Sequence, residues 1–326
     1  EEAVINKLGF KRKAIPGEGD GTQEMGVKAG LDALKRTGID PMTIDLILCV
    51  GEEWKEYPLT TSGIYIQEKI GALNAWSIDL QQRCNTTLAA LKMAKDMIIA
   101  DPEINTVMVV GGYRNGDFID FADPAVSFMY NLGAAGGAFI LQRNYKKNVI
   151  LGSHFITDGS MARDAGVEYG GTEKPINSLS KEIQDDVLKR GNKSLRVFDP
   201  KHMKDRLNEV SMPNWFKCID KSLEKSNLTR NDLSFLNIIP FKYSMYKAFL
   251  EELGLTVEQS VYLDQYGHCG QIDQMINVHE GIEQGRLKDG DVMVIVAAGI
   301  GYVWGAMIVK WGPIRRIILR LILILE

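Results

Sequence analysis

The sequence predicts an α/β protein whose sheets are covered by helices. Strand-like apolar runs alternate with amphipathic helical stretches along most of the chain, a pattern typical of this fold class. Stretches of the second half also repeat stretches of the first half in the same order. With 326 residues, of which 45% are hydrophobic and 25% charged, the chain is long enough to bury a large core and has the composition of a globular protein.

The first half contains helices and strands of ordinary length. Helices are predicted over residues 22–37, where Gly38 ends the helix, and over 86–100. Continuous apolar runs predict buried strands, because strands covered on both faces do not alternate. These strands lie at 45–50 (DLILCV), 106–110 (TVMVV) and 137–141 (GAFIL).

The second half follows the same course. Residues 34–39 and the strand that ends at 48–50 are matched by residues 223–228 and the strand that ends at 237–239. The run VMVV at 107–110 is matched by VMVI at 292–295 at nearly the same offset. Two similar α/β halves are therefore predicted, each too large to be a solenoid repeat.

This repeat divides the chain into an N-terminal half (1–150), an insert (151–212), a C-terminal half (213–311) and a tail (312–326). The insert is polar from 158 onward and is expected to form loops and short helices that shape a pocket. The tail ends in an apolar run that is too short to span a bilayer. We expect a buried strand, an oligomer contact or an added non-native segment there, in preference to a membrane-surface role.

Composition argues against several classes of function. The formal charge of −4, without a basic stripe, argues against nucleic acid as a partner. The four cysteines form no C-x-x-C pair, and three of the four histidines have no neighbour suited to sharing a metal, so neither a disulfide scaffold nor a metal site is expected. The first residues lack the features of a signal peptide, so a cytoplasmic protein with free thiols is expected.

The strongest chemical candidate is Cys84. Residues 77–87 (SIDLQQRCNTT) predict a strand-like segment that turns at Cys84 into a helix. A thiol at a helix N-terminus faces the positive end of the helix dipole, which favours the nucleophilic thiolate, and Arg83 adds a cation if its side chain turns inward. Free cysteines are also among the most buried residues, so a core cysteine remains the alternative.

Four motifs carry a resemblance to a known family. The spacing from Asp79 to Cys84 before a helix of small residues resembles the nucleophile segment of β-ketoacyl-acyl-carrier-protein synthase III, of the thiolase superfamily. Three later segments are similar to the family's glycine turn, its Gly-Asn segment and its closing glycine motif: 133–138 (GAAGGA, without the family's acidic residue), 264–268 (DQYGH) and 299–305 (GIGYVWG). The match runs in order over nearly all of residues 5–311. Family members usually have a further strand-forming segment before the point matched by Glu1.

The resemblance implies a thiolase-like fold in which two duplicated α/β halves form five layers, αβαβα, with the active site between the halves, and it implies a homodimer. It also implies an acyltransferase of fatty acid or polyketide biosynthesis. An acyl group would pass from a coenzyme A (CoA) or acyl-carrier-protein (ACP) phosphopantetheine thioester to Cys84, and then to an acceptor. The thioester is a substrate, so no permanently bound cofactor is implied.

The family uses a Cys-His-Asn triad, of which only the cysteine carries over unchanged. Phe241, or Pro240, stands at the position of the family histidine, and His268 stands at that of the asparagine. The resemblance places His268 opposite Cys84 as a general base or oxyanion donor; otherwise it is a turn histidine. Asp273 is a candidate to orient His268, with a solvated helix residue as the alternative.

The resemblance also assigns an oxyanion hole to the backbone N–H groups of Cys84 and of the turn at Ile300 and Gly301, which would otherwise be a structural turn. Cys269 and Trp304 are assigned to packing. Three functions remain open: acyl transfer to a malonyl-type carbanion or another nucleophile, a non-condensing acyltransferase or thioesterase, and a non-catalytic subunit that has lost the family histidine.

Overall fold

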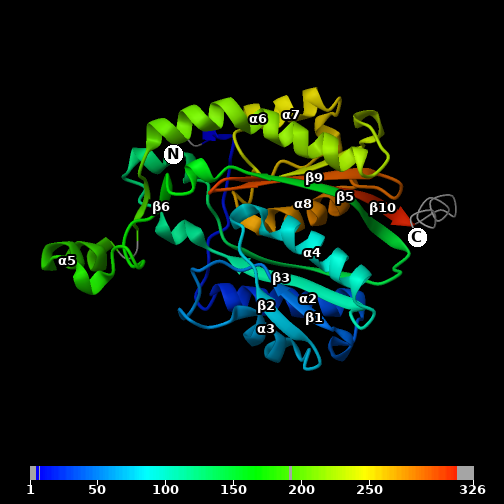
Figure 1. Ribbon diagram of the computed structural model, residues 1–326, viewed down its shortest axis with the longest axis horizontal. Helices are drawn as coiled ribbons and strands as arrows, with labels where there is room; N and C mark the ends of the chain where they lie inside the picture. The colour runs from blue at the N-terminus through cyan, green and yellow to red at the C-terminus, as the bar shows by residue number, and fades with distance from the viewer. Residues whose placement is uncertain (1–4, 7, 191–192, 314–326) are drawn as a thin grey trace.

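The computed structural model describes residues 5–6, 8–190 and 193–313. Most of the apolar tail, from 314 onward, lies outside these residues. Within them, no helix is both long enough and apolar enough to cross a membrane. The chain runs from a short N-terminal segment through two helix-covered sheets (Figure 1).

Two four-stranded sheets form the framework, with the strand orders β2-β1-β3-β4 and β5-β10-β9-β8. The first sheet contains β1 (Leu46–Cys49), β2 (Trp76–Asp79), β3 (Thr106–Tyr113) and β4 (Ala135–Gln142). The second contains β5 (Lys147–Thr157), β8 (Phe235–Ile238), β9 (Val292–Gly299) and β10 (Val303–Pro313). The first sheet has one antiparallel pair, β3 with β4. In the second sheet, β10 pairs antiparallel with both β9 and β5.

The helices lie in three layers around these sheets, as Figure 1 shows. They are α2 (Thr22–Thr37), α3 (Ser62–Ile70), α4 (Thr86–Ala100), α5 (Lys181–Arg190), α6 (Pro200–Glu224), α7 (Tyr243–Glu252) and α8 (Asp273–Glu283). α2 and α3 cover the outside of the first sheet, α6 and α7 cover the outside of the second, and α4 and α8 lie between the sheets. The predicted five-layered, thiolase-like arrangement of two halves is confirmed.

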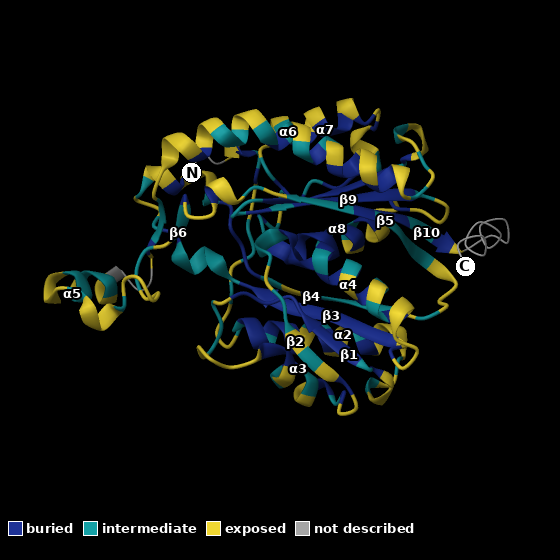
Figure 2. Cartoon of the chain, viewed as in Figure 1, coloured by how far each residue is buried: buried dark blue, intermediate teal, exposed yellow. Residues whose placement is uncertain are grey.

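The strands are apolar throughout because both of their faces are covered. In β1, Leu46 and Leu48 face the central helices, whereas Ile47 and Cys49 face α2 and α3. Figure 2 shows the same division, with buried strands and with exposed residues on the outer sides of the outer helices. This explains why the sequence showed continuous apolar runs in place of alternation.

The repeat seen in the sequence corresponds to the two halves. α2 ends before Gly38, whose φ is 69°, and the segment after α6 contains Asn227 with a φ of 53°. Both residues adopt the left-handed conformation that commonly ends a helix, and a strand follows each of them, β1 and β8 respectively. The matched runs at 107–110 and 292–295 are the central strands β3 and β9.

The insert differs from its prediction at both ends. β5 begins at Lys147, so the expected boundary at 150 lies inside a strand. Loops and short helices were expected up to 212, but the long helix α6 begins at Pro200 and crosses that boundary. Two ordinary start signals explain the early helix, since the Asp199 side chain accepts a hydrogen bond of 2.9 Å from the His202 N–H and Pro200 occupies the first turn. Between these elements, α5 stands away from the two halves near the small sheet of β6 (Ala165–Val167) and β7 (Leu195–Val197) (Figure 1).

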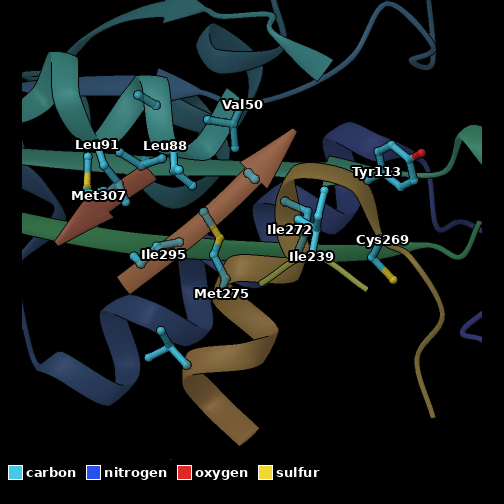
Figure 3. Packing of buried hydrophobic residues seen from close by; sticks show 14 of the residues in the cluster. Val50, Leu88, Leu91, Tyr113, Ile239, Cys269, Ile272, Met275, Ile295 and Met307 are labelled. Atoms are coloured by element: carbon cyan, nitrogen blue, oxygen red, sulfur yellow. The ribbon is translucent and has the colours of Figure 1, made fainter. Parts of the chain in front are cut away.

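The central layer decides where the site forms. Figure 3 shows Leu88 and Leu91 of α4 and Met275 of α8 packed with Ile295 and Met307 of the second sheet. The starts of the two buried helices are joined directly, because the Thr87 hydroxyl donates a hydrogen bond of 2.6 Å to the Gln271 carbonyl. Segments that precede α4 and α8 are therefore brought together although they are far apart in the sequence.

Candidate active site

The segment that carries Cys84 is fixed at both ends. Upstream, the carboxylate of Asp79 accepts hydrogen bonds of 2.9 and 2.8 Å from the N–H groups of Ser62 and Gly63 at the start of α3. Downstream, the Thr86 hydroxyl accepts from the Gln82 N–H at 2.8 Å and donates to the Arg83 carbonyl at 2.6 Å. Cys84 lies between these anchors in the 3-10 helix η2 (Arg83–Asn85), directly before α4, and is half-buried. The predicted position at a helix N-terminus is confirmed.

His268 reaches the thiol from the loop before α8. Its backbone is pinned on both sides, since its N–H donates to the Asn131 carbonyl at 2.8 Å and its carbonyl accepts from the Gly133 N–H at 2.8 Å. Gly133 itself has no room for a side chain, because a Cβ would lie 2.8 Å from the Tyr266 carbonyl oxygen. Held in this way, His268 Nε2 lies 3.1 Å from Cys84 Sγ.

Asp273 holds the far side of the imidazole. Its side chain is completely buried, one carboxylate oxygen is hydrogen-bonded to His268 Nδ1, and the other accepts from the Cys269 N–H at 2.7 Å. A solvated helix residue, the alternative for Asp273, is therefore excluded. A carboxylate at Nδ1 leaves Nε2 free to exchange a proton with the thiol, which is the relation of acid, imidazole and nucleophile in hydrolase triads.

Charge in the site favours a protonated imidazole. Burial lowers the pKa of His268, but the neighbouring Cys84 and Asp273 raise it further, so that the pKa of His268 lies well above its ordinary value. Burial also raises the pKa of Asp273, against the opposing effects of His268 and the Cys269 N–H. The Asp273 carboxylate accepts two hydrogen bonds that stabilise its charge, so it forms an ion pair with the protonated imidazole of His268.

The other three cysteines are buried and poorly suited to nucleophilic chemistry. Burial raises the pKa of Cys49 and of Cys218 to about 12, and it raises the pKa of Cys269 well above its ordinary value. Cys269, next to His268, points its thiol toward the Tyr266 carbonyl at 3.7 Å. The packing role predicted for Cys269 agrees with these contacts.

Among the described residues, His268 is the imidazole in contact with Cys84, and no second one contacts it. Phe241, at the position of the family histidine, packs its ring against Trp215 with the centroids 4.9 Å apart. Two of the remaining histidines make contacts elsewhere: His154 contacts Lys225, and His202 contacts Asp164. Where the resemblance implies two side-chain donors, the described residues bring one imidazole, that of His268, to Cys84.

The predicted oxyanion turn lies against the nucleophile segment. Gly299 ends β9, and a Cβ there would lie 2.6 Å from the Gln82 carbonyl oxygen and 3.0 Å from Arg83 Cβ. Ile300 and Gly301 follow at once, so their backbone is close to Cys84. Their role in an oxyanion hole, with the Cys84 N–H, stays a prediction. Trp304 is buried in the outer core of the second half, as expected.

Several polar residues around the site were missed at the level of sequence. The Gln274 side chain donates to the Cys84 carbonyl at 3.4 Å, and Asn237 donates to the Gln274 carbonyl at 2.9 Å. Gln271 donates to the Val50 carbonyl at 2.5 Å, which ties the start of α8 to the first sheet. The available signal was a polar residue within an apolar stretch, such as Asn237 in the strand FLNI, because buried polar groups need partners.

Comparisons with known proteins identify one family. The profile described as 3-oxoacyl-(acyl-carrier-protein) synthase III matches residues 78–159, and its C-terminal counterpart matches residues 223–311. Among relatives, a β-ketoacyl-(acyl-carrier-protein) synthase III from Aliarcobacter butzleri is 27% identical over 318 residues, covering 97% of this chain and 91% of the relative. One from Microcystis aeruginosa is 26% identical over 313 residues, covering 96% and 90%.

Solved structures with the same fold include members of that family. The enzyme from Thermus thermophilus superposes with a TM-score of 0.79 at 21% identity, covering 96% of this chain and 91% of its own. The enzyme from Aquifex aeolicus gives 0.78 at 21% identity, covering 95% and 91%. A protein named ChlB3 and described as an acyltransferase gives 0.74 at 21% identity, covering 96% and 90%.

Iodoacetamide near neutral pH should label the native protein once, at Cys84. Below a pH of about 12 the buried thiols of Cys49 and Cys218 remain neutral, and a neutral thiol is a poor nucleophile. Intact mass and peptide mapping measure the labelling, and Cys84→Ser should take up no label. Labelling of another cysteine in the folded protein would contradict the assignment.

Proposed function

Because this chain belongs to the 3-oxoacyl-(acyl-carrier-protein) synthase III family, whose two matched segments together span just over half of it, we propose that it is an acyltransferase that carries the acyl group on Cys84. The observation that supports this most directly is the 3.1 Å contact between Cys84 Sγ and His268 Nε2, with Asp273 behind the imidazole. A nucleophile, a base and an orienting carboxylate are the parts that acyl transfer through a thioester needs. An intact set of this kind argues against a non-catalytic subunit.

The first half-reaction acylates the enzyme. The Cys84 thiol gives its proton to His268 Nε2, and the thiolate attacks the carbonyl carbon of a phosphopantetheine thioester of CoA or ACP. The negative charge on the carbonyl oxygen is stabilised by the backbone N–H groups of Cys84 and of the turn at Ile300 and Gly301. The carbon–sulfur bond to the donor then breaks, and the leaving thiolate takes the proton from the His268 imidazolium.

The second half-reaction passes the acyl group to an acceptor. His268, again neutral, removes a proton from an acceptor hydroxyl, amine or thiol, which attacks the acyl carbon and displaces the Cys84 thiolate. The imidazolium and the Cys84 thiolate that remain are the pair that attacked the donor in the first half-reaction, so the enzyme is ready for another donor. Asp273 stabilises the positive imidazole in both halves, which explains why a carboxylate is kept fully buried behind it.

An acceptor with its own proton suits this site better than a malonyl carbanion. Decarboxylation of a malonyl thioester leaves an enolate, which needs donors in addition to those used in acylation. Phe241 offers no donor, so in the acyl-enzyme His268 Nε2 is left as the single imidazole donor at the sulfur. We therefore place the chain with non-condensing acyltransferases; the similarity in fold to ChlB3 is compatible with this.

A panel of acyl-CoA and acyl-ACP thioesters should acylate the protein once. Intact mass should increase by one acyl group, and Cys84→Ala should abolish the adduct. His268→Ala should slow adduct formation by a factor on the order of 10² to 10⁴, because it removes the base. The matched control is Cys269→Ala, which removes a buried thiol four residues from Asp273 and should keep the adduct. An adduct retained by Cys84→Ala would exclude the proposed carrier.

Malonyl condensation should be slow or absent. Losing one preorganised donor costs a factor on the order of 10² to 10³ in rate, so release of CO₂ from malonyl thioesters should stay far below the rate of about 1 s⁻¹ that is ordinary for enzymes. The measurement is CO₂ release by the acylated enzyme, with acyl transfer to small alcohols, amines and thiols followed in parallel. Condensation at an ordinary rate would show that another residue supplies the missing donor.

The protein should be a homodimer in solution, as its family membership suggests. In the described part of the chain, β2 is one of the two edge strands of the first sheet, and its Trp76 and Ile78 side chains are 50% and 40% exposed. An exposed apolar edge strand favours pairing with another copy. Light scattering at micromolar concentration should give twice the chain mass, and Ile78→Lys should give the single-chain mass with unchanged circular dichroism. A monomeric wild-type protein would contradict this proposal.

A further inference from the structure

One buried carboxylate near the site takes no part in the chemistry above. Glu52 follows β1, and its side chain is only 2% exposed. One carboxylate oxygen accepts a hydrogen bond of 2.9 Å from Arg83 Nη1, whereas the other is buried and has no partner among the described residues. Carboxylates are rarely buried to this degree, because removing the charge from water costs several kcal/mol unless a partner compensates. The burial of the Glu52 carboxylate therefore points to a role for its contact with Arg83.

Arg83, its partner, precedes the nucleophile in an unusual conformation. Its φ is 54°, in the left-handed region, although it is not a glycine. This conformation costs roughly 1–2 kcal/mol for an L-residue with a Cβ. It persists only when the surroundings hold it, and it sets the direction in which the chain enters Cys84.

The surroundings of Arg83 hold it from two sides. On one side the guanidinium contacts Glu52 and also Glu53, whose two oxygens lie 2.6 and 3.1 Å from it. On the other side its Cβ lies against Gly299, where an added Cβ would be 3.0 Å away. Arg83 is therefore wedged between the loop after β1 and the turn that carries Ile300 and Gly301.

The two carboxylates differ in how firmly they can hold it. The Glu53 side chain is 65% exposed, and exposed ion pairs contribute little because solvent screens them. Glu52 is enclosed while the Arg83 side chain is 41% exposed, so solvent screens this pair less than the pair with Glu53, and the geometry of Glu52 is restricted. Burial raises the pKa of Glu52, while Arg83 and Asn115 oppose that shift. Burial raises the pKa of Tyr113, and the charges of Cys84, Glu52 and Asp273 raise it further.

We propose that Glu52 is a positioning residue that acts through Arg83: its buried carboxylate holds the guanidinium, and this contact fixes the left-handed backbone that aims Cys84 at His268. The notion rests on the proposed function, since it takes Cys84 as the nucleophile. It adds a second carboxylate, which comes from the other half of the fold than Asp273 and acts on the residue before the thiol. Arg83 thereby serves as a structural cation and not as a free charge beside the thiol.

Glu52→Gln tests this, because glutamine keeps the shape of the side chain and removes its charge. The second-order rate of Cys84 alkylation by iodoacetamide and the kcat of acylation should both fall by about one to two orders of magnitude, the loss expected for a displacement of about 1 Å. KM for the thioester should change little. Glu53→Gln, the matched control in the same ion-pair group, should change either rate by no more than about threefold.

A double-mutant cycle separates positioning from a general structural effect. In an Arg83→Met background, Glu52→Gln should cause no further loss, because the contact through which it acts is already gone. Additive losses, or equal losses for Glu52→Gln and Glu53→Gln, would overturn the proposal. Arg83→Lys provides a second test in case the Glu52→Gln protein is unstable. It keeps the charge on a partly exposed side chain, so it should fold, but it loses the planar guanidinium. Its rate of Cys84 alkylation should fall several-fold.

Failure of this proposal is distinguishable from failure of the proposed function. A wild-type protein whose Cys84 neither alkylates nor becomes acylated would contradict the acyltransferase itself. A wild-type protein that reacts normally, together with a Glu52→Gln variant that reacts at the same rate, would contradict only the positioning role. Circular dichroism and thermal unfolding of each variant establish that the compared proteins are folded.

Discussion

The contact between Cys84 and His268 depends on two buried helices that begin at the same place. α4 and α8 come from different halves of the chain, and both lie between the sheets, where neither can shift without opening the central core. The hydrogen bond from Thr87 to the Gln271 carbonyl joins their first turns. A thiol before one helix and an imidazole before the other are then held 3.1 Å apart by the packing of the whole fold. The duplicated architecture thus supplies the precision that catalysis by two separate side chains requires.

Charges buried in such a core must balance locally. His268 is paired with Asp273, and Arg83 with Glu52, so that each cation lies next to a carboxylate from its own side of the site. Breaking a buried pair by removing one partner leaves an uncompensated charge, which costs more than an exposed pair ever contributes. The same enclosure strengthens the influence of each carboxylate on its partner. The two pairs therefore link stability to catalytic geometry, and their residues are costly to change one at a time.

The sequence predicted the sheets and the pair of Cys84 and His268 better than it predicted the residues that hold this pair in place. Continuous apolar runs identified β1, β3 and β4, and Cys84 was found because a strand-to-helix turn is a local pattern. His268 and Asp273 needed the resemblance, which placed one loop opposite another. Glu52 could not be found, because its partner Arg83 lies 31 positions away and periodicity does not show which way a charged side chain turns. The start of α6 was missed because a polar helix on the outside of the fold lacks a strong apolar period.

The proposed chemistry of the site follows from two replacements of side-chain types. Where the resemblance places the family histidine, this chain has Phe241 or Pro240, and the ring of Phe241 belongs to the aromatic group of Trp215 and Phe249. Where the resemblance places the family asparagine, this chain has His268, and the buried carboxylate of Asp273 is hydrogen-bonded to its imidazole. An asparagine donates but cannot take up a proton, whereas an imidazole backed by a carboxylate does both. In the proposed reaction, the donor set that would stabilise a carbanion is thus reduced, and an imidazole able to remove a proton from an acceptor lies 3.1 Å from Cys84, the proposed acyl carrier.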